Sequence, residues 1–145
     1  MTTKEMFELS DKIYDKLNDY RQEMTNAIIT CMNERGVKEI DLRKMREDNE
    51  EMGLLDVSER FDDIANNHLV EIYNKDGETL DCFIDRVTIK DAGFVECVCS
   101  GVQDYDFEST ESVRLLDIYA IMDVMEWVAE YFDVMDEMAS KDNVK

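Results

Sequence analysis

The sequence predicts an α+β fold: a long N-terminal helix and a C-terminal helix packed on an antiparallel meander of three or four strands. Apolar residues recur with helical spacing over residues 3–34 and 112–138. They alternate with polar residues, as in strands, over residues 68–108. A chain of 145 residues with 44% hydrophobic residues is long enough for one buried core. We therefore expect one domain over residues 1–145, with a short helical or irregular segment at residues 37–67.

The first helix, within residues 1–36, is the clearest element. Thr2 and Glu5 have the spacing of a capping box, and Gly36 is well placed to end the helix. Its apolar residues are Met6, Leu9, Ile13, Leu17, Tyr20, Met24, Ile28 and Cys31. Their gaps of three and four average about 3.67 residues per turn, which keeps the stripe nearly parallel to the axis. A helix of about 45 Å should extend past a domain of this size, either solvated or paired with a second copy.

The sequence of residues 37–43, which follow this helix, is compatible with two kinds of secondary structure. Residues 37–43 fit a short strand, because Ile40 and Leu42 alternate with charged residues, or the start of a short helix that ends before Gly53. Residues 56–66 are predicted to be a short helix from the spacing of Val57, Phe61 and Ile64.

The sheet is predicted from four apolar runs separated by turn residues. The expected strands are residues 69–73, 79–90, 94–100 and, more weakly, 105–107. Lys75-Asp76-Gly77 supplies hairpin chemistry between the first two. In the second strand the alternation changes parity at Asp85-Arg86, which predicts a β-bulge.

The last helix is expected over residues 112–138, in one piece or broken near Asp117. With residues placed every 100°, its apolar side chains fill an arc of roughly 220°, whereas one core face needs only about 100°. The helix is therefore either sandwiched between the sheet and the first helix, or it contributes to an interface.

The charge balance excludes some partners and favours others. The chain has 36 acidic against 16 basic residues, a net charge of −20. Such a surface repels the phosphates of nucleic acids and anionic membranes, and it attracts basic proteins at low salt. The alternative is that the charge serves only solubility.

Cysteine usage and the N-terminus favour the cytoplasm. Residues 1–5 lack the apolar core of a signal peptide, so thiols are expected rather than disulfides. Cys97 and Cys99 share one face of a strand, with Cys82 on the next strand and His68, the only histidine, near the start of the sheet. A zinc site could be assembled from them, but the pair lacks the usual Cys-x₂₋₄-Cys turn, which favours buried structural thiols.

The sharpest pattern is a row of carboxylates on the last helix, which we call the carboxylate ladder. Its members are Asp123, Glu126, Glu130, Asp133 and Glu137. Their gaps of 3-4-3-4 place them on one helix edge over about 21 Å, with neighbours about 5–6 Å apart. No basic residue lies between Leu115 and Ser140 to offset them. The ladder is either a solvated helix face or a rigid imitation of a phosphate backbone that binds a nucleic-acid-handling protein.

A second acidic group could bind a hard cation. Asp104, Asp106 and Glu108 alternate with Tyr105 and Phe107, so on a strand their carboxylates would share a face and could hold Ca²⁺ or Mg²⁺. The alternative is the wet side of an edge strand, where acidic residues discourage pairing. No EF-hand spacing is present.

These patterns favour a non-enzymatic protein without a cofactor or a metal. No nucleophile elbow, glycine-rich phosphate loop, H-E-x-x-H or redox Cys-x-x-Cys motif occurs. The leading hypothesis is an acidic interaction protein, in its sharper form a nucleic-acid mimic that inhibits a basic DNA- or RNA-handling protein. The first alternative is a structural homodimer held by the long helix and the wide apolar arc of the last helix. The second is a divalent-metal-dependent enzyme that uses Asp104, Asp106 and Glu108.

Overall fold

The computed structural model describes residues 1–73, 76–91, 93–102 and 108–143. Its elements in chain order are α1 (Thr3–Glu34), β1 (Glu39–Asp41), α2 (Leu42–Glu51), α3 (Leu55–Asn67), β2 (Leu69–Tyr73), β3 (Thr79–Ile89), β4 (Val95–Gly101), β5 (Glu108–Ser112), the 3₁₀ turn η1 (Val113–Leu115) and α4 (Ile118–Asn143). The predicted α+β class is confirmed.

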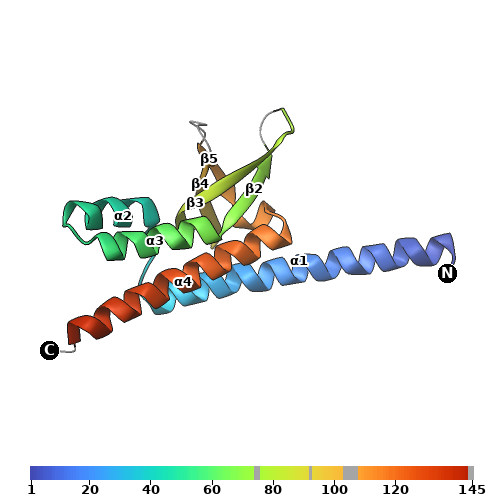
Figure 1. Ribbon diagram of the computed structural model, residues 1–145. Helices are drawn as coiled ribbons and strands as arrows, with labels where there is room; N and C mark the ends of the chain where they lie inside the picture. The colour runs from blue at the N-terminus through green and yellow to red at the C-terminus, as the bar shows by residue number, and fades with distance from the viewer. Residues whose placement is uncertain (74–75, 92, 103–107, 144–145) are drawn as a thin grey trace.

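The elements form three layers (Figure 1). The antiparallel sheet lies on one side, α3 and α4 lie against it, and α1 lies on the far side of α4. The last helix thus separates the first helix from the sheet. The N-terminal half of α1 projects beyond the rest of the molecule (Figure 1).

The sheet is the predicted meander with one strand added. Strands β2, β3, β4 and β5 pair in chain order, and β1 pairs with β3 beyond the end of β2. The predicted bulge is confirmed, because the register of β3 against β4 shifts between Ile84 and Arg86. The weak strand expected at residues 105–107 lies outside the described residues, and the described strand β5 begins at Glu108.

The two structures weighed for residues 37–43 both occur. Residues 39–41 pair with β3 as β1, and α2 begins at Leu42. Asp41 caps this helix, because its carboxylate accepts the backbone N–H of Lys44 at 3.0 Å. The helix predicted at residues 56–66 is confirmed as α3.

The last helix starts later than predicted. Residue 112 ends β5, one 3₁₀ turn follows, and α4 begins at Ile118. Asp117 marks this start, because its carboxylate accepts the backbone N–H of Ala120 at 2.9 Å. The alternative of two helices with a break near Asp117 is not observed, because the residues before Asp117 end β5 and form only the 3₁₀ turn η1.

The wide apolar arc of α4 is explained by its place between two layers. Trp127, Ile121 and Val124 are fully buried, and α4 contacts α1 on one side and α3 and β2 on the other. Of the two structures weighed for this arc, the sandwiched helix is the one observed. No described helix has the length and apolar character needed to cross a membrane.

By contrast, α1 is buried only near its C-terminal end. Its buried residues are Thr25, Ile28 and Met32. The predicted capping box is present, with the backbone N–H of Glu5 donating to Oγ1 of Thr2 at 3.2 Å. The stripe residues Met6 and Ile13 lie beyond the packed part and are 53% and 50% exposed.

The cysteines are free thiols, and three of them are in the core. Cys82, Cys97 and Cys99 are buried, and Cys31 is half-buried. The Sγ atoms of Cys97 and Cys99 lie 3.8 Å apart. The hydrogen bond with Cys97 and burial raise the pKa of Cys99, and burial raises the pKa of Cys82. A raised pKa favours the protonated form of both thiols, which is a weaker nucleophile and metal ligand than the thiolate.

Candidate functional site

The carboxylate ladder runs along the side of α4 that faces α3 and the start of β2. One end of it meets His68, which follows the last residue of α3, and the other end meets Arg60 within α3. The ladder remains accessible, with side-chain exposures of 35% at Asp123, 59% at Glu126 and 50% at Glu137. We call the residues from Asp123 to Glu130 the upper end and Asp133 with Glu137 the lower end.

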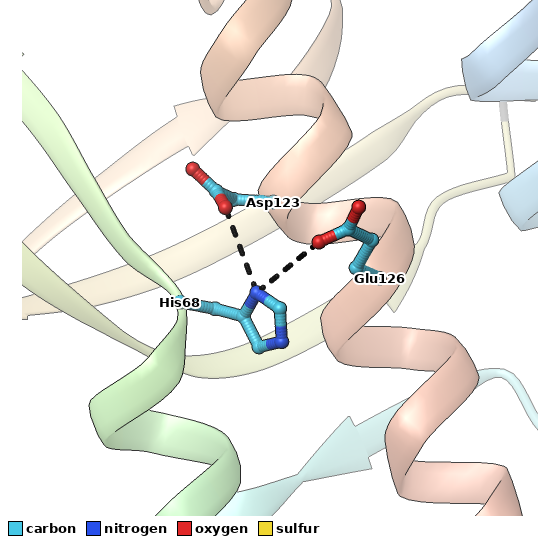
Figure 2. Close-up of side chains that lie close together, drawn as sticks. All are labelled: His68, Asp123 and Glu126. Atoms are coloured by element: carbon cyan, nitrogen blue, oxygen red, sulfur yellow. Dashed lines mark ion pairs between the residues drawn. The ribbon is translucent and has the colours of Figure 1, made fainter.

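His68 is the residue that organises the upper end. Inward-facing residues of β2 are Val70 and Ile72, and His68 precedes them with the same alternation, so its ring is directed toward α4. It is only 4% exposed. Figure 2 shows the imidazole between β2 and α4 with two carboxylates of the helix turned toward it.

The distances around this ring are short. Nδ1 of His68 lies 3.5 Å from Oδ1 of Asp123 and 3.8 Å from Oε2 of Glu126 (Figure 2). On the other side of the ring, Nε2 lies 3.1 Å from Oε2 of Glu130. Neither ring nitrogen forms an aligned hydrogen bond with a described residue, although both are buried. Three carboxylates of the upper end therefore converge on one buried imidazole.

Two arginines from outside α4 bind carboxylates near the lower end: Glu137, which belongs to the ladder, and its neighbour Asp136, which does not. Arg60 of α3 binds both carboxylate oxygens of Glu137, with Nη2 at 3.2 Å from Oε1. Arg35, just past α1, binds Asp136 through two hydrogen bonds of 2.5 and 2.8 Å and lies 5.0 Å from the ring centre of Phe132. The hydrogen bond from Arg35 lowers the pKa of Asp136, and that carboxylate raises the pKa of Arg35.

These pairs change the interpretation of the ladder. Between Asp123 and Glu137, α4 contains no basic residue, and the ladder's partners there are Arg60 of α3 and the imidazole of His68, just past the end of α3. Asp133 is exposed and lines a shallow hollow together with Asp136, Glu137 and Ser140. The ladder is therefore partly neutralised by Arg60 at its lower end, faces the imidazole of His68 at its upper end and is open at Asp133.

The zinc site that was weighed for the thiols is not assembled among the described residues, and the favoured interpretation, buried thiols, agrees with the burial of Cys82, Cys97 and Cys99. Among the described residues, those whose ligand atoms meet as a group of three or more are His68, Asp123 and Glu126, within 4.8 Å of one another. The single histidine thus joins the carboxylates of α4 and not the thiols of the sheet. Sequence reasoning treated His68 and the ladder separately, because 55 residues separate His68 from Asp123.

The second predicted metal group is described only at one residue. Asp104 and Asp106 lie outside the described residues, and Glu108 is exposed at the start of β5. The Ca²⁺ or Mg²⁺ hypothesis for this group therefore stays a prediction.

A buried carboxylate that the sequence did not single out occupies the β-bulge. Asp85 is 8% exposed, and Oδ2 of its carboxylate forms no hydrogen bond with a described residue. Burial raises the pKa of Asp85, while a hydrogen bond with Ser100 and the nearby Arg43 and Arg46 oppose the shift. In the sequence, the change in alternation at Asp85-Arg86 indicates the β-bulge, but it does not indicate that the side chain of Asp85 is buried.

No protein-family model, curated protein or solved structure matches this chain. At the upper end of the ladder, three described carboxylates lie within ion-pair distance of the imidazole of His68. Such a surface can attract cationic groups, either the side chains of another protein or a metal ion.

Proposed function

We propose that this chain is a non-enzymatic interaction protein that binds a basic partner through the carboxylate ladder of α4. The observation that supports this most directly is the exposure of the ladder along one edge of a helix whose apolar residues, among them Trp127 and Val128, are buried in the core. Because the core fixes the backbone of α4, little backbone freedom is lost when a partner binds the ladder.

The spacing of the ladder suits an array of basic side chains. Neighbouring carboxylates at intervals of three and four residues lie about 5–6 Å apart between Cβ atoms. Arginines and lysines that neutralise phosphates gain affinity from a similar row of negative charges. In its sharper form, the proposal is that the ladder mimics a nucleic-acid backbone and occupies a DNA- or RNA-handling protein.

The arginines at the lower end are compatible with such binding. The Arg60–Glu137 and Arg35–Asp136 pairs are solvent-exposed, with side chains 41–54% accessible. Exposed ion pairs contribute little net stability. A partner arginine can therefore exchange with them at small cost while the salt dependence of binding is retained.

The test is affinity capture from a cell lysate at about 50 mM and about 500 mM salt, concentrations that differ strongly in screening. The ladder variant Glu126→Gln/Glu130→Gln/Asp133→Asn removes three charges. The matched control Asp11→Asn/Asp15→Asn/Asp19→Asn removes three charges from α1 on the side away from its apolar stripe.

The proposal expects a few basic nucleic-acid-handling proteins, released at high salt and absent with the ladder variant but present with the control. Capture that is equal for the two variants would contradict it, because net charge alone would then explain the binding.

A second candidate is a homodimer through α1, supported by its exposed apolar residues. Met6, Leu9, Ile13 and Tyr20 are 46–53% exposed. Residues 1–24 carry 6 acidic and 4 basic residues, a net charge of −2, which leaves −18 for the rest of the chain. Two copies therefore repel each other only weakly along this segment, and its mixed charges can pair across an interface.

The dimer candidate is tested by sedimentation over a concentration series. Ile13→Glu should abolish a concentration-dependent mass, and Gln22→Glu, which adds the same charge outside the stripe, should retain it. A monomeric mass for the unaltered chain at every concentration would exclude this candidate without affecting the first.

A further inference from the structure

We propose that His68, Asp123 and Glu126 form a binding site for a divalent transition-metal ion of the Zn²⁺ type. This goes beyond the proposed partner binding and does not depend on it. The proposal rests on a buried imidazole without an aligned hydrogen bond that faces two carboxylates one helical turn apart.

The separations between the donor atoms fit one ion. Metal–nitrogen and metal–oxygen bonds of about 2.0–2.2 Å in a tetrahedral zinc site place two ligand atoms about 3.4 Å apart. Nδ1 of His68 lies 3.5 Å from the nearest oxygen of Asp123 and 3.8 Å from that of Glu126. The donor atoms all lie within 4.8 Å of one another, so small side-chain rotations complete the site.

Glu130 lies close enough to His68 to become the outer partner that metal-binding histidines usually have. A histidine that binds a metal through one nitrogen usually donates the other N–H to a carboxylate, which fixes the ring orientation. Oε2 of Glu130 lies 3.1 Å from Nε2, on the side of the ring away from Asp123 and Glu126. We therefore assign Glu130 as a positioning residue, with Nδ1 as the ligand atom.

The donor set selects the kind of ion. One imidazole nitrogen and two carboxylates suit Zn²⁺ and similar first-row divalent ions. Ca²⁺ prefers six to eight oxygen ligands, and Mg²⁺ prefers octahedral oxygen coordination with several waters. The site therefore favours Zn²⁺ over both.

A metal ion could reach this group from solvent, and its coordination shell would keep one open position. A hollow of about 290 Å³ lies beside the group, between the start of β2 and the start of α4, and Asp123 lines it together with Leu69 and Tyr119. Three protein ligands leave a fourth position for water or for a donor from another molecule.

An ion at this site would connect two separate parts of the chain. His68 lies at the α3–β2 junction, and both carboxylates belong to α4. A ligand that binds only the folded state stabilises that state by mass action. Zn²⁺ should therefore raise the unfolding temperature and reduce the negative charge at the upper end of the ladder.

The test is calorimetric titration of the full chain with ZnCl₂, together with thermal unfolding. We expect one Zn²⁺ per chain and a rise in unfolding temperature that EDTA reverses, with no such rise in CaCl₂ or MgCl₂.

Asp123→Asn and Glu126→Gln alter accessible side chains, 35% and 59% exposed, and should each weaken Zn²⁺ binding at least 10-fold. Glu130→Gln should weaken it by about 10-fold, as is typical of outer partners. The control Asp133→Asn, on the same helix but outside the group, should not change it.

Two further readouts separate this site from the thiols. His68 is the only histidine, so its ring resonances in an NMR spectrum are unambiguous and should shift with one equivalent of Zn²⁺. Co²⁺ should bind without a thiolate-to-metal charge-transfer band. No Zn²⁺ binding, binding that Asp123→Asn and Glu126→Gln leave unchanged, or a thiolate band would overturn the assignment. None of these results depends on capture of a partner, so the two proposals fail separately.

Discussion

The two long helices of this protein carry similar apolar patterns but use them differently. In α4, Trp127 and Ile121 are fully buried between two layers. In α1, Ile28 is buried, whereas Ile13 in the same stripe is 50% exposed. An apolar stripe therefore predicts that a helix can make a contact, but not whether its own chain supplies the other side.

The polar sides of the two helices differ as well. The N-terminal part of α1 mixes acidic and basic residues, and Lys4 and Glu8 form an ion pair within the helix. The described cations that pair with α4 come from outside it, namely Arg35 and Arg60. The ladder therefore depends on residues outside α4 for the neutralisation of Glu137.

Among the substitutions that test this difference between α1 and α4, Trp127→Ala should have the largest effect on the free energy of unfolding. Removal of a fully buried aromatic side chain should lower the free energy of unfolding by about 3–5 kcal/mol. Urea denaturation followed by circular dichroism measures this loss. A change below about 1 kcal/mol would show that α4 is not the central helix of the core.

A matched pair of substitutions tests the division within α1. Ile28→Ala should cost about 2–5 kcal/mol because the side chain is 1% exposed. Ile13→Ala in dilute solution should change the free energy of unfolding by less than about 0.5 kcal/mol. Similar losses at both positions would mean that the exposed half of α1 is packed in solution, as the dimer candidate requires.

Asp85→Asn should have a smaller effect that depends on pH. Burial raises the pKa of Asp85 above its ordinary value of 3.8, so ionisation of this carboxylate opposes folding. The penalty is absent below that ordinary value, grows as the pH rises and is complete above the raised pKa. The variant should therefore be more stable than the parent chain at pH 7, by on the order of 1 kcal/mol, and should lose this advantage in acid. An advantage that persists unchanged below pH 3.8 would contradict the assigned cause.

Asp136→Asn should have the smallest effect, with the opposite pH dependence. The hydrogen bond from Arg35 lowers the pKa of Asp136, so the ion pair contributes stability above the ordinary value of 3.8. This contribution is lost as the pH falls through the lowered pKa. The variant should be slightly less stable than the parent chain at pH 7 and equal to it in strong acid, as thermal unfolding over a pH series would measure. A variant more stable at pH 7 would contradict this account.

Most of the fold could be predicted because its signals are local. The capping box of Thr2 and Glu5, the parity change at Asp85 and the helical spacing around Phe61 each need only neighbouring residues. The pairing of β1 with β3 was harder to predict, because it joins residues 39–41 to residues 86–88 across the chain. The late start of α4 was missed because β5 took residue 112, which the helical pattern also fitted.

One part of the candidate site, the carboxylate ladder, could be predicted from local sequence, whereas its contacts with other elements could not. The ladder follows from spacing within α4 alone. The contacts of Glu137 with Arg60 and of Glu130 with His68 depend on how α3 packs beside α4, which no local pattern specifies. The alternation that directs Val70 inward could have indicated the direction of His68, but not the helix that it would meet.

The most direct test of the proposed function is the salt dependence of the affinity for a captured basic partner. The parent chain and the α1 triple variant should bind with similar dissociation constants that rise steeply between about 50 and 500 mM salt. The ladder variant should bind at least about 10-fold more weakly at low salt and with a shallower salt dependence, because it offers fewer charges to the partner. Equal losses for the ladder and α1 variants would contradict the account, because the acidic surface as a whole, and not α4, would then be responsible.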